Sequence, residues 1–354
     1  MRWIAIAVLL VVTQGGRAAA ESGTTSAAAK KAIADSISAA LQGDGVRARA
    51  ALVAVPAEQF SKDDVPYRAC MIERFSDQPH PLPAANTDDA FVREVLQMYQ
   101  EYWRRALMNP SQRDALAADL RRKLSAFLGE GAVVRDWDAL ESRLSERLKG
   151  RAHHSQLGYT PPLRELMIWR KRNSEVHSIE LPEGAHHITV EKLDDFVSLG
   201  WSSYARCGRG SNGGWVGEDR IFAVMPAFAN EAGEDAFRAS LLAHETQHFA
   251  DLERFGELEN WRLEYRAKLT ELWAAGESLN KLLTKFAASQ SDDKDSPHTY
   301  ANKRVLIALR ERLRVKRIES SAPNLEDAPV DDIREAARAE LIEDSRRLAA
   351  AKKR

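Results

Sequence analysis

The segment His244-Glu245-Thr246-Gln247-His248 contains the residue types and spacing that metal-assisted chemistry requires. Two histidines four residues apart lie on the same face of a helix, so their imidazoles can converge on one ion. Zinc accepts such nitrogens at about 2.0–2.1 Å. Glu245 lies beside the metal position and can take a proton from a zinc-bound water, whose pKa falls to about 7. The motif therefore predicts one Zn²⁺, held by His244 and His248, with Glu245 as the general base.

The residues around this motif predict a helix whose histidines are on its buried face. Apolar side chains and the two histidines recur at spacings of 4, 3, 4, 4 and 3 residues. The members of this stripe are Phe237, Leu241, His244, His248, Leu252 and Phe255. Two buried imidazoles without partners would be costly, and a shared metal ion removes that cost. The alternative is a pair of structural histidines with other partners.

A third protein ligand is expected from the helix that follows. Gly256 is a natural helix end, and His248 and Glu264 each lie eight residues from it. At 1.5 Å per residue the chain travels about 12 Å to the bend and about 12 Å back, so Glu264 returns to the level of His248. Glu271 overshoots by roughly 10 Å on the same arithmetic. An i,i+4 surface pair with Lys268 is the other role open to Glu264. The remaining candidates for the third ligand are Glu257, Glu259, Glu271 and His298.

Periodicity along the rest of the chain predicts an α+β protein that is mostly helical, with a small sheet before the motif helix. The predicted N-terminal helices are Ala27–Leu41, Val46–Val55, Asp89–Met108, Ser111–Leu128 and Ala139–Leu148. The predicted strands are Val176–Leu181, His186–Val190, Phe196–Ala205 and Arg220–Met225. A glycine-rich stretch between the last two strands lacks the lysine of a phosphate loop, which favours a flexible connection.

The chain is expected to have four parts. Residues 1–20 have a basic start, the apolar run Trp3–Val12 and an Ala-x-Ala end, a pattern typical of a cleaved secretory signal. A helical N-terminal domain over 21–150, a metal-site domain over 151–290 and a helical C-terminal segment over 291–354 follow. The signal predicts export to the periplasm or the extracellular space. The alternative for the apolar run is an unusually apolar first core helix.

Charge and composition exclude several function classes. The chain has 51 Lys+Arg against 52 Asp+Glu and 7% aromatic residues, so nucleic acid is not an expected partner. Beyond residue 20 the sequence offers no apolar run long enough to cross a membrane, so stable membrane insertion is not expected. With only Cys70 and Cys207, a thiolate-rich zinc site is excluded. One disulfide and two buried thiols are both open for this pair.

The motif and the following helix resemble the zincin metallopeptidases of the glutamate-ligand type, the gluzincins. The resemblance rests on His244-Glu245-x-x-His248 and on Glu264 in Glu-Tyr-Arg-Ala, and covers roughly residues 215–285. It implies a sheet before the motif helix whose edge strand binds substrate backbone, a position that Arg220–Met225 matches. It also implies a Tyr or His that stabilises the oxyanion. The sequence does not choose among the candidates for that role, which are Tyr204, Tyr265, His298 and Tyr300.

These observations predict a secreted or periplasmic zinc-dependent peptidase, a hydrolase that acts on a peptide or protein substrate. Zinc on His244, His248 and Glu264 would polarise the scissile carbonyl, and Glu245 would deprotonate the water and protonate the leaving amine. The rival interpretation is an exported binding or scaffold protein whose zincin-like core binds zinc but is catalytically inactive.

Overall fold

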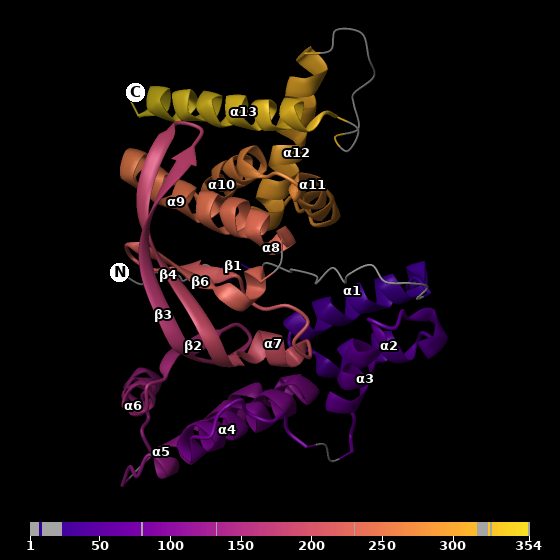
Figure 1. Cartoon of the computed structure of the whole chain (residues 1–354), viewed down its shortest axis with the longest axis vertical. Coiled ribbons are helices and arrows are strands. Elements are labelled where there is room, and N and C mark those ends of the chain that lie inside the picture. The colour runs from indigo at the N-terminus through magenta and orange to yellow at the C-terminus, as the bar shows by residue number, and fades with distance from the viewer. Residues whose placement is uncertain are drawn as a thin grey trace. The chain divides into compact units, whose positions relative to one another are not determined.

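The chain has an α+β fold, seen in the computed structural model of Figure 1. The structure describes residues 7–8, 23–78, 81–131, 133–229, 231–316, 325 and 328–352. Contacts divide the chain into two compact units. The N-terminal unit consists of residues 11–172 and 193–212, and the C-terminal unit of residues 1–10, 173–192 and 213–354.

The N-terminal unit contains the five helices that the sequence predicts and two more. Its helices are α1 (Ala27–Leu41), α2 (Gly45–Val53), α3 (Val65–Arg74), α4 (Ala90–Met108), α5 (Arg113–Phe127), α6 (Trp137–Lys149) and α7 (Trp201–Ala205). The sequence analysis missed α3, in which Pro66 reads as a break. Proline fits there because the first turn of a helix leaves its N–H groups without intrahelical partners. The helices pack around large buried side chains such as Tyr99 and Trp103.

A disulfide between Cys70 on α3 and Cys207 just after α7 closes this unit. The two Cα atoms are 6.2 Å apart, and the cysteines are separated by 137 positions in the sequence. Of the two states that the sequence left open for this pair, the structure has the bonded one.

The strands form one sheet in the order β1-β5-β6-β4-β3-β2. Their bounds are β1 (Ala7–Val8), β2 (His154–Thr160), β3 (Leu163–Leu181), β4 (Gly184–Leu199), β5 (Gly214–Val216) and β6 (Arg220–Val224). β3 and β4 form a long hairpin that contributes residues to both units. The predicted strands Val176–Leu181 and His186–Val190 are parts of this hairpin, and the predicted strand Phe196–Ala205 overlaps the end of β4.

Two sequence predictions in this region are wrong. The predicted strand Phe196–Ala205 ends at Leu199, because Gly200 has a φ of +84° and the chain turns into α7. The Glu165 carboxylate accepts a hydrogen bond from the Trp201 amide at 2.9 Å, and it fills the space that a side chain at Gly200 would need. The glycine-rich stretch is not only a connection, since Gly214–Val216 pairs antiparallel with β6 as strand β5.

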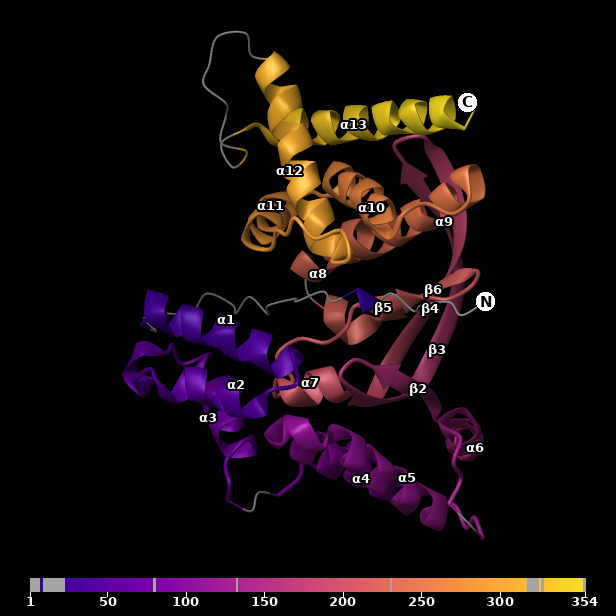
Figure 2. The same cartoon turned by 180° about the vertical axis from the view of Figure 1, so that it is seen from behind.

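The C-terminal unit holds the motif helix. After β6 come α8 (Glu231–Ala236), a π-helical segment η4 (Phe237–Ala243), α9 (His244–Phe255), α10 (Asn260–Ala274), α11 (Leu279–Ala288), α12 (Pro297–Lys316) and α13 (Val330–Ala351). Figure 2 shows α10 surrounded by α9, α11, α12 and α13. Leu269 and Leu272 of α10 lie in the core of this unit with Leu309 and Ile333. α12 and α13, which lie in the predicted C-terminal segment, belong to the same unit as the motif helix and pack on α10.

The predicted signal at 1–20 lies outside the described residues, apart from the backbone of Ala7–Val8. None of the helices in the described ranges combines the length and the apolar character that a membrane crossing requires.

Replacing Cys70 and Cys207 by serine should destabilise the N-terminal unit by about 2–5 kcal/mol, because the bond closes a long loop and restricts the unfolded chain. Urea unfolding followed by tryptophan fluorescence measures this as a lower midpoint. A reductant should move the wild-type midpoint to that of the double variant and leave the variant unchanged. Equal midpoints for wild type and variant without reductant would contradict the stabilising role of the disulfide.

Candidate metal centre

The motif helix is buried where the sequence predicts histidine ligands. His244 and His248 are 3% and 7% exposed, and Glu245 between them is fully buried. Immediately before them, η4 has π-helical hydrogen bonding, a rare geometry that is common at functional sites. Leu241 of this segment packs next to Gly214 of β5, which places the segment against the sheet.

The bend after the motif helix occurs at the residue that the sequence predicts. α9 ends at Phe255, and Gly256 has a φ of +75°, a conformation that favours glycine. α10 then starts at Asn260 and returns alongside α9. The helix-length argument therefore holds, and it brings Glu264 back to the histidines.

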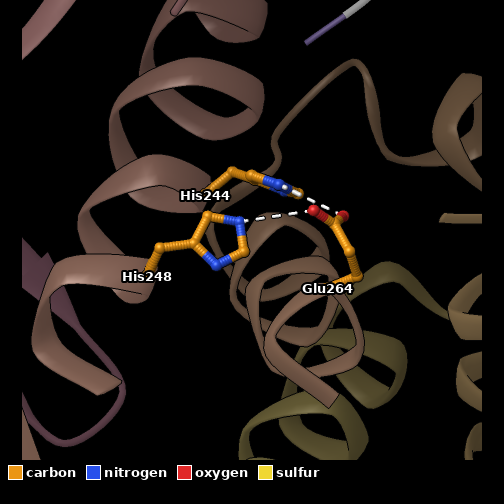
Figure 3. Close-up of side chains that lie close together, drawn as sticks. All are labelled: His244, His248 and Glu264. Carbon is orange, nitrogen blue, oxygen red and sulfur yellow. Dashed lines mark ion pairs between the residues drawn. The ribbon is translucent and has the colours of Figure 1, made fainter. Parts of the chain in front are cut away.

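Glu264 points at both imidazoles from the facing helix, as Figure 3 shows. Its Oε1 atom is 3.5 Å from His248 Nε2, and its Oε2 atom is 3.7 Å from His244 Nε2. Ligand atoms of His244, His248 and Glu264 all lie within 4.8 Å of one another. These distances agree with the expectation that Glu264 returns to the level of His248.

These distances fit a tetrahedral zinc. Two donors at about 2.0–2.1 Å from such an ion are about 3.4 Å apart, close to the two nitrogen–oxygen distances found here. The Nε2 atoms of His244 and His248 and both carboxylate oxygens of Glu245 are buried and form no hydrogen bond within the described ranges. Buried polar atoms normally have a partner, so this set fits an ion that binds between the histidines and Glu264.

The charges at the site also fit a divalent cation. Three carboxylates, those of Glu245, Glu264 and Glu271, are buried, and Lys268 is a buried ammonium next to them. Lys268 Nζ is 4.0 Å from Glu264 Oε2, so the i,i+4 pair of the sequence analysis exists, but it is buried in the site and not on the surface. With all three carboxylates ionised and the imidazoles neutral, these groups carry a charge of −2, which Zn²⁺ would neutralise.

The pKa values of the carboxylates differ with their neighbours. Burial raises the pKa of Glu245. Burial opposes ionisation of Glu264 too, but the close contacts with His248 and His298 and the charge of the nearby imidazoles hold its pKa well below the usual value. Glu264 is therefore anionic at neutral pH, as a metal ligand must be, whereas Glu245 has the higher proton affinity that a general base needs.

Glu271 lies much closer to the site than the sequence analysis expected. Its Oε2 atom is 3.4 Å from His244 Nδ1, the nitrogen that faces away from Glu264. The expected overshoot was measured from His248. His244 lies one turn before His248 on α9, which is level with a later part of the antiparallel α10. Glutamate side chains also lean towards the N-terminus of their helix, which brings the Glu271 carboxylate back towards His244. The His244 contact outweighs burial and lowers the Glu271 pKa to about 2. A carboxylate on the second nitrogen orients a ligating histidine, so Glu271 is a positioning residue that the sequence analysis missed.

A buried polar network fixes α9 against α10 one turn beyond the histidines. Arg266 is fully buried and donates from Nε and Nη2 to the two Asp251 oxygens, both at 2.8 Å. Gln247 donates to Asp251 at 2.8 Å and accepts from Thr270 at 2.7 Å. Arg266 also donates to Asp344 of α13 at 3.1 Å. This network sets the register in which Glu264 faces the histidines.

The residues considered for oxyanion stabilisation have different surroundings. His298 at the start of α12 is 46% exposed, and its Nδ1 is 2.8 Å from Glu264 Oε2. Tyr265 donates instead to Glu340 at 2.9 Å, and the Tyr300 ring packs against Trp261. Tyr204 belongs to the N-terminal unit, where it is buried. Of the four, His298 is the one whose side chain contacts a site residue in the part of the chain that the structure describes.

The segment Arg220–Met225, expected at the sheet edge, is not an edge strand. Its residues 220–224 form β6, which lies between β5 and β4. Gly214–Val216 is the strand on its outer side, and that strand pairs in turn with Ala7–Val8. The expectation failed because β5 is short and lies in a glycine-rich stretch without strand periodicity.

Comparison of the chain with known protein families, with curated proteins and with solved structures finds no match.

Glu264→Ala should lower zinc affinity by more than about 100-fold, because it removes one of three protein ligands and leaves the helices in place. Competition with a chromogenic chelator measures the affinity. Glu257→Ala, an exposed glutamate near the bend, should bind zinc like the wild type.

Glu271→Gln should have an intermediate effect, roughly a 10-fold loss, because it acts through His244. Wild-type zinc affinity in Glu264→Ala would remove Glu264 from the ligand set.

Proposed function

We propose that this chain is a zinc-dependent peptidase of the gluzincin type. The observation that carries the proposal is the convergence of His244, His248 and Glu264 around one point, with the unpartnered carboxylate of Glu245 adjacent to it. Residue types and spacing at this site resemble those of enzymes that hydrolyse peptide bonds with metal-activated water.

The chemistry divides between the ion and the protein. Zinc bound to His244, His248 and Glu264 would supply a Lewis acid that polarises the scissile carbonyl and lowers the pKa of a water to about 7. Glu245 takes the proton of the attacking water on a carboxylate oxygen and passes it to the leaving amine nitrogen. Its raised pKa favours holding that proton between the two steps. Glu271 holds the His244 ring so that Nε2 faces the ion.

The substrate in this proposal is a peptide or protein, and the enzyme works outside the cytoplasm. Export is supported by the sequence pattern of residues 1–20 and is consistent with the Cys70–Cys207 disulfide, since such bonds persist in oxidising compartments. The proposal includes neither a nucleic acid partner nor stable insertion in a membrane.

One observation favours the rival function, an exported binding or scaffold protein with an inactive zinc core. Glu245 is fully buried, and Glu264 is 1% exposed, as in a structural zinc site. The side chain nearest the surface is His298, which contacts Glu264 and is 46% exposed. A peptidase requires that substrate reach the metal, here past His298. A scaffold protein has no such requirement.

Glu245→Gln should retain zinc and fold but lower the turnover of a cleaved peptide by at least about 100-fold, because the amide cannot accept the proton. The assay is hydrolysis of casein and of a peptide library by the zinc-loaded protein, with and without chelator. Glu253→Gln on the exposed side of the same helix is the matched control and should retain full activity.

Two results would contradict the proposal. Activity that survives in Glu245→Gln would remove Glu245 from the mechanism. Stoichiometric zinc in the wild type without hydrolysis of any peptide would favour the scaffold.

A further inference from the structure

A cavity in the N-terminal unit concentrates positive charge and aromatic rings on one concave surface. Its volume is about 470 Å³, within the range of ligand pockets.

 A second cavity, of about 820 Å³, lies between α10, α12 and α13 of the C-terminal unit, and its walls balance four arginines against four acidic residues. The 470 Å³ cavity of the N-terminal unit does not balance its charges, because three arginines and a single aspartate line it.

The arginines of this smaller cavity are held in place but are not neutralised equally. Arg113 donates to the Gly43 carbonyl at 2.8 Å, and Arg121 donates to the Arg135 carbonyl at 2.8 Å. No ion pair joins either guanidinium to a carboxylate in the part of the chain that the structure describes. Arg164 is the exception, since its Nη1 is 3.4 Å from Glu141 Oε1.

Aromatic side chains complete the walls. The guanidinium of Arg164 lies over the Trp137 ring at 4.2 Å and over the Tyr159 ring at 5.6 Å. Tyr159 is 58% exposed near the end of β2, so its ring is accessible to a ligand in the cavity. Tryptophan, tyrosine and arginine are also the residue types that contribute most to binding energy at protein interfaces.

We propose that this cavity binds an acidic segment of a polypeptide, with carboxylates on Arg113 and Arg121 and an aromatic side chain against Tyr159. Guanidinium groups fixed by main-chain carbonyls lose little entropy when they bind a carboxylate, and the interaction is charge-assisted. The site is distinct in sequence and in unit from the metal centre, so this inference does not depend on the peptidase proposal.

The test measures binding of a fluorescein-labelled Glu-Tyr-Glu-Tyr-Glu peptide to the full chain carrying Glu245→Gln, by fluorescence anisotropy at low salt. The background substitution prevents hydrolysis of the probe. Arg121→Gln should weaken binding by about 10-fold, the loss of one charge-assisted contact. Arg122→Gln is the matched control, because the neighbouring Arg122 is exposed and pairs with Asp119 at 2.9 Å.

Tyr159→Ser is a second variant, at an exposed side chain. It should lower the affinity for the acidic peptide several-fold and leave the thermal unfolding temperature unchanged. A Lys-Tyr-Lys-Tyr-Lys peptide should not bind. Two results would overturn the proposal. One is that the acidic peptide does not bind, and the other is that it binds equally to the Arg121, Tyr159 and Arg122 variants.

Discussion

The metal centre depends on the antiparallel packing of α9 against α10. Neither helix contains a complete ligand set, since His244 and His248 lie on one and Glu264 on the other. Gly256 makes the reversal possible, and the buried pair of Asp251 and Arg266 fixes how far along α10 the chain has returned. A slip of one residue would rotate Glu264 by about 100° around its helix, away from the imidazoles.

This arrangement concentrates unfavourable electrostatics in one place. Burying three carboxylates costs free energy that Lys268, the imidazoles and hydrogen bonds offset only in part. A bound divalent ion would remove the remaining imbalance, so metal binding and stability of the C-terminal unit should be linked. The same imbalance separates the roles of the acids, because Glu264 has a lowered pKa and Glu245 a raised one.

Much of the site could be predicted from the sequence because it is local. His244, Glu245 and His248 lie within one helical turn and a half, and the return distance to Glu264 needs only the rise per residue and the position of one glycine. Glu271 was missed because its contact depends on side-chain length and direction, which a count of residues does not include. The contact between His298 and Glu264 comes from the packing of α12, some thirty residues further along the chain, and no periodicity encodes it.

The fold was less accessible to the same reasoning. Amphipathic helices such as α1 and α4 were predicted within a residue or two, because their buried faces repeat every three to four positions. The long hairpin of β3 and β4 was predicted only in pieces. Strand β5 was not predicted and the strand at the end of β4 was continued too far, because Gly214 and Gly200 are determined by contacts with Phe222 and Glu165 from other strands. Tertiary contacts outweigh local propensity at such positions.

The central claim is that one zinc ion binds to His244, His248 and Glu264, and X-ray absorption at the zinc edge of the metal-loaded chain tests it most directly. The account predicts one zinc per chain with only nitrogen and oxygen neighbours at about 2.0–2.2 Å, and with the scattering pattern of two imidazoles. A third imidazole would identify His298 as a ligand in place of Glu264. That result, or the absence of stoichiometric zinc, would contradict the account.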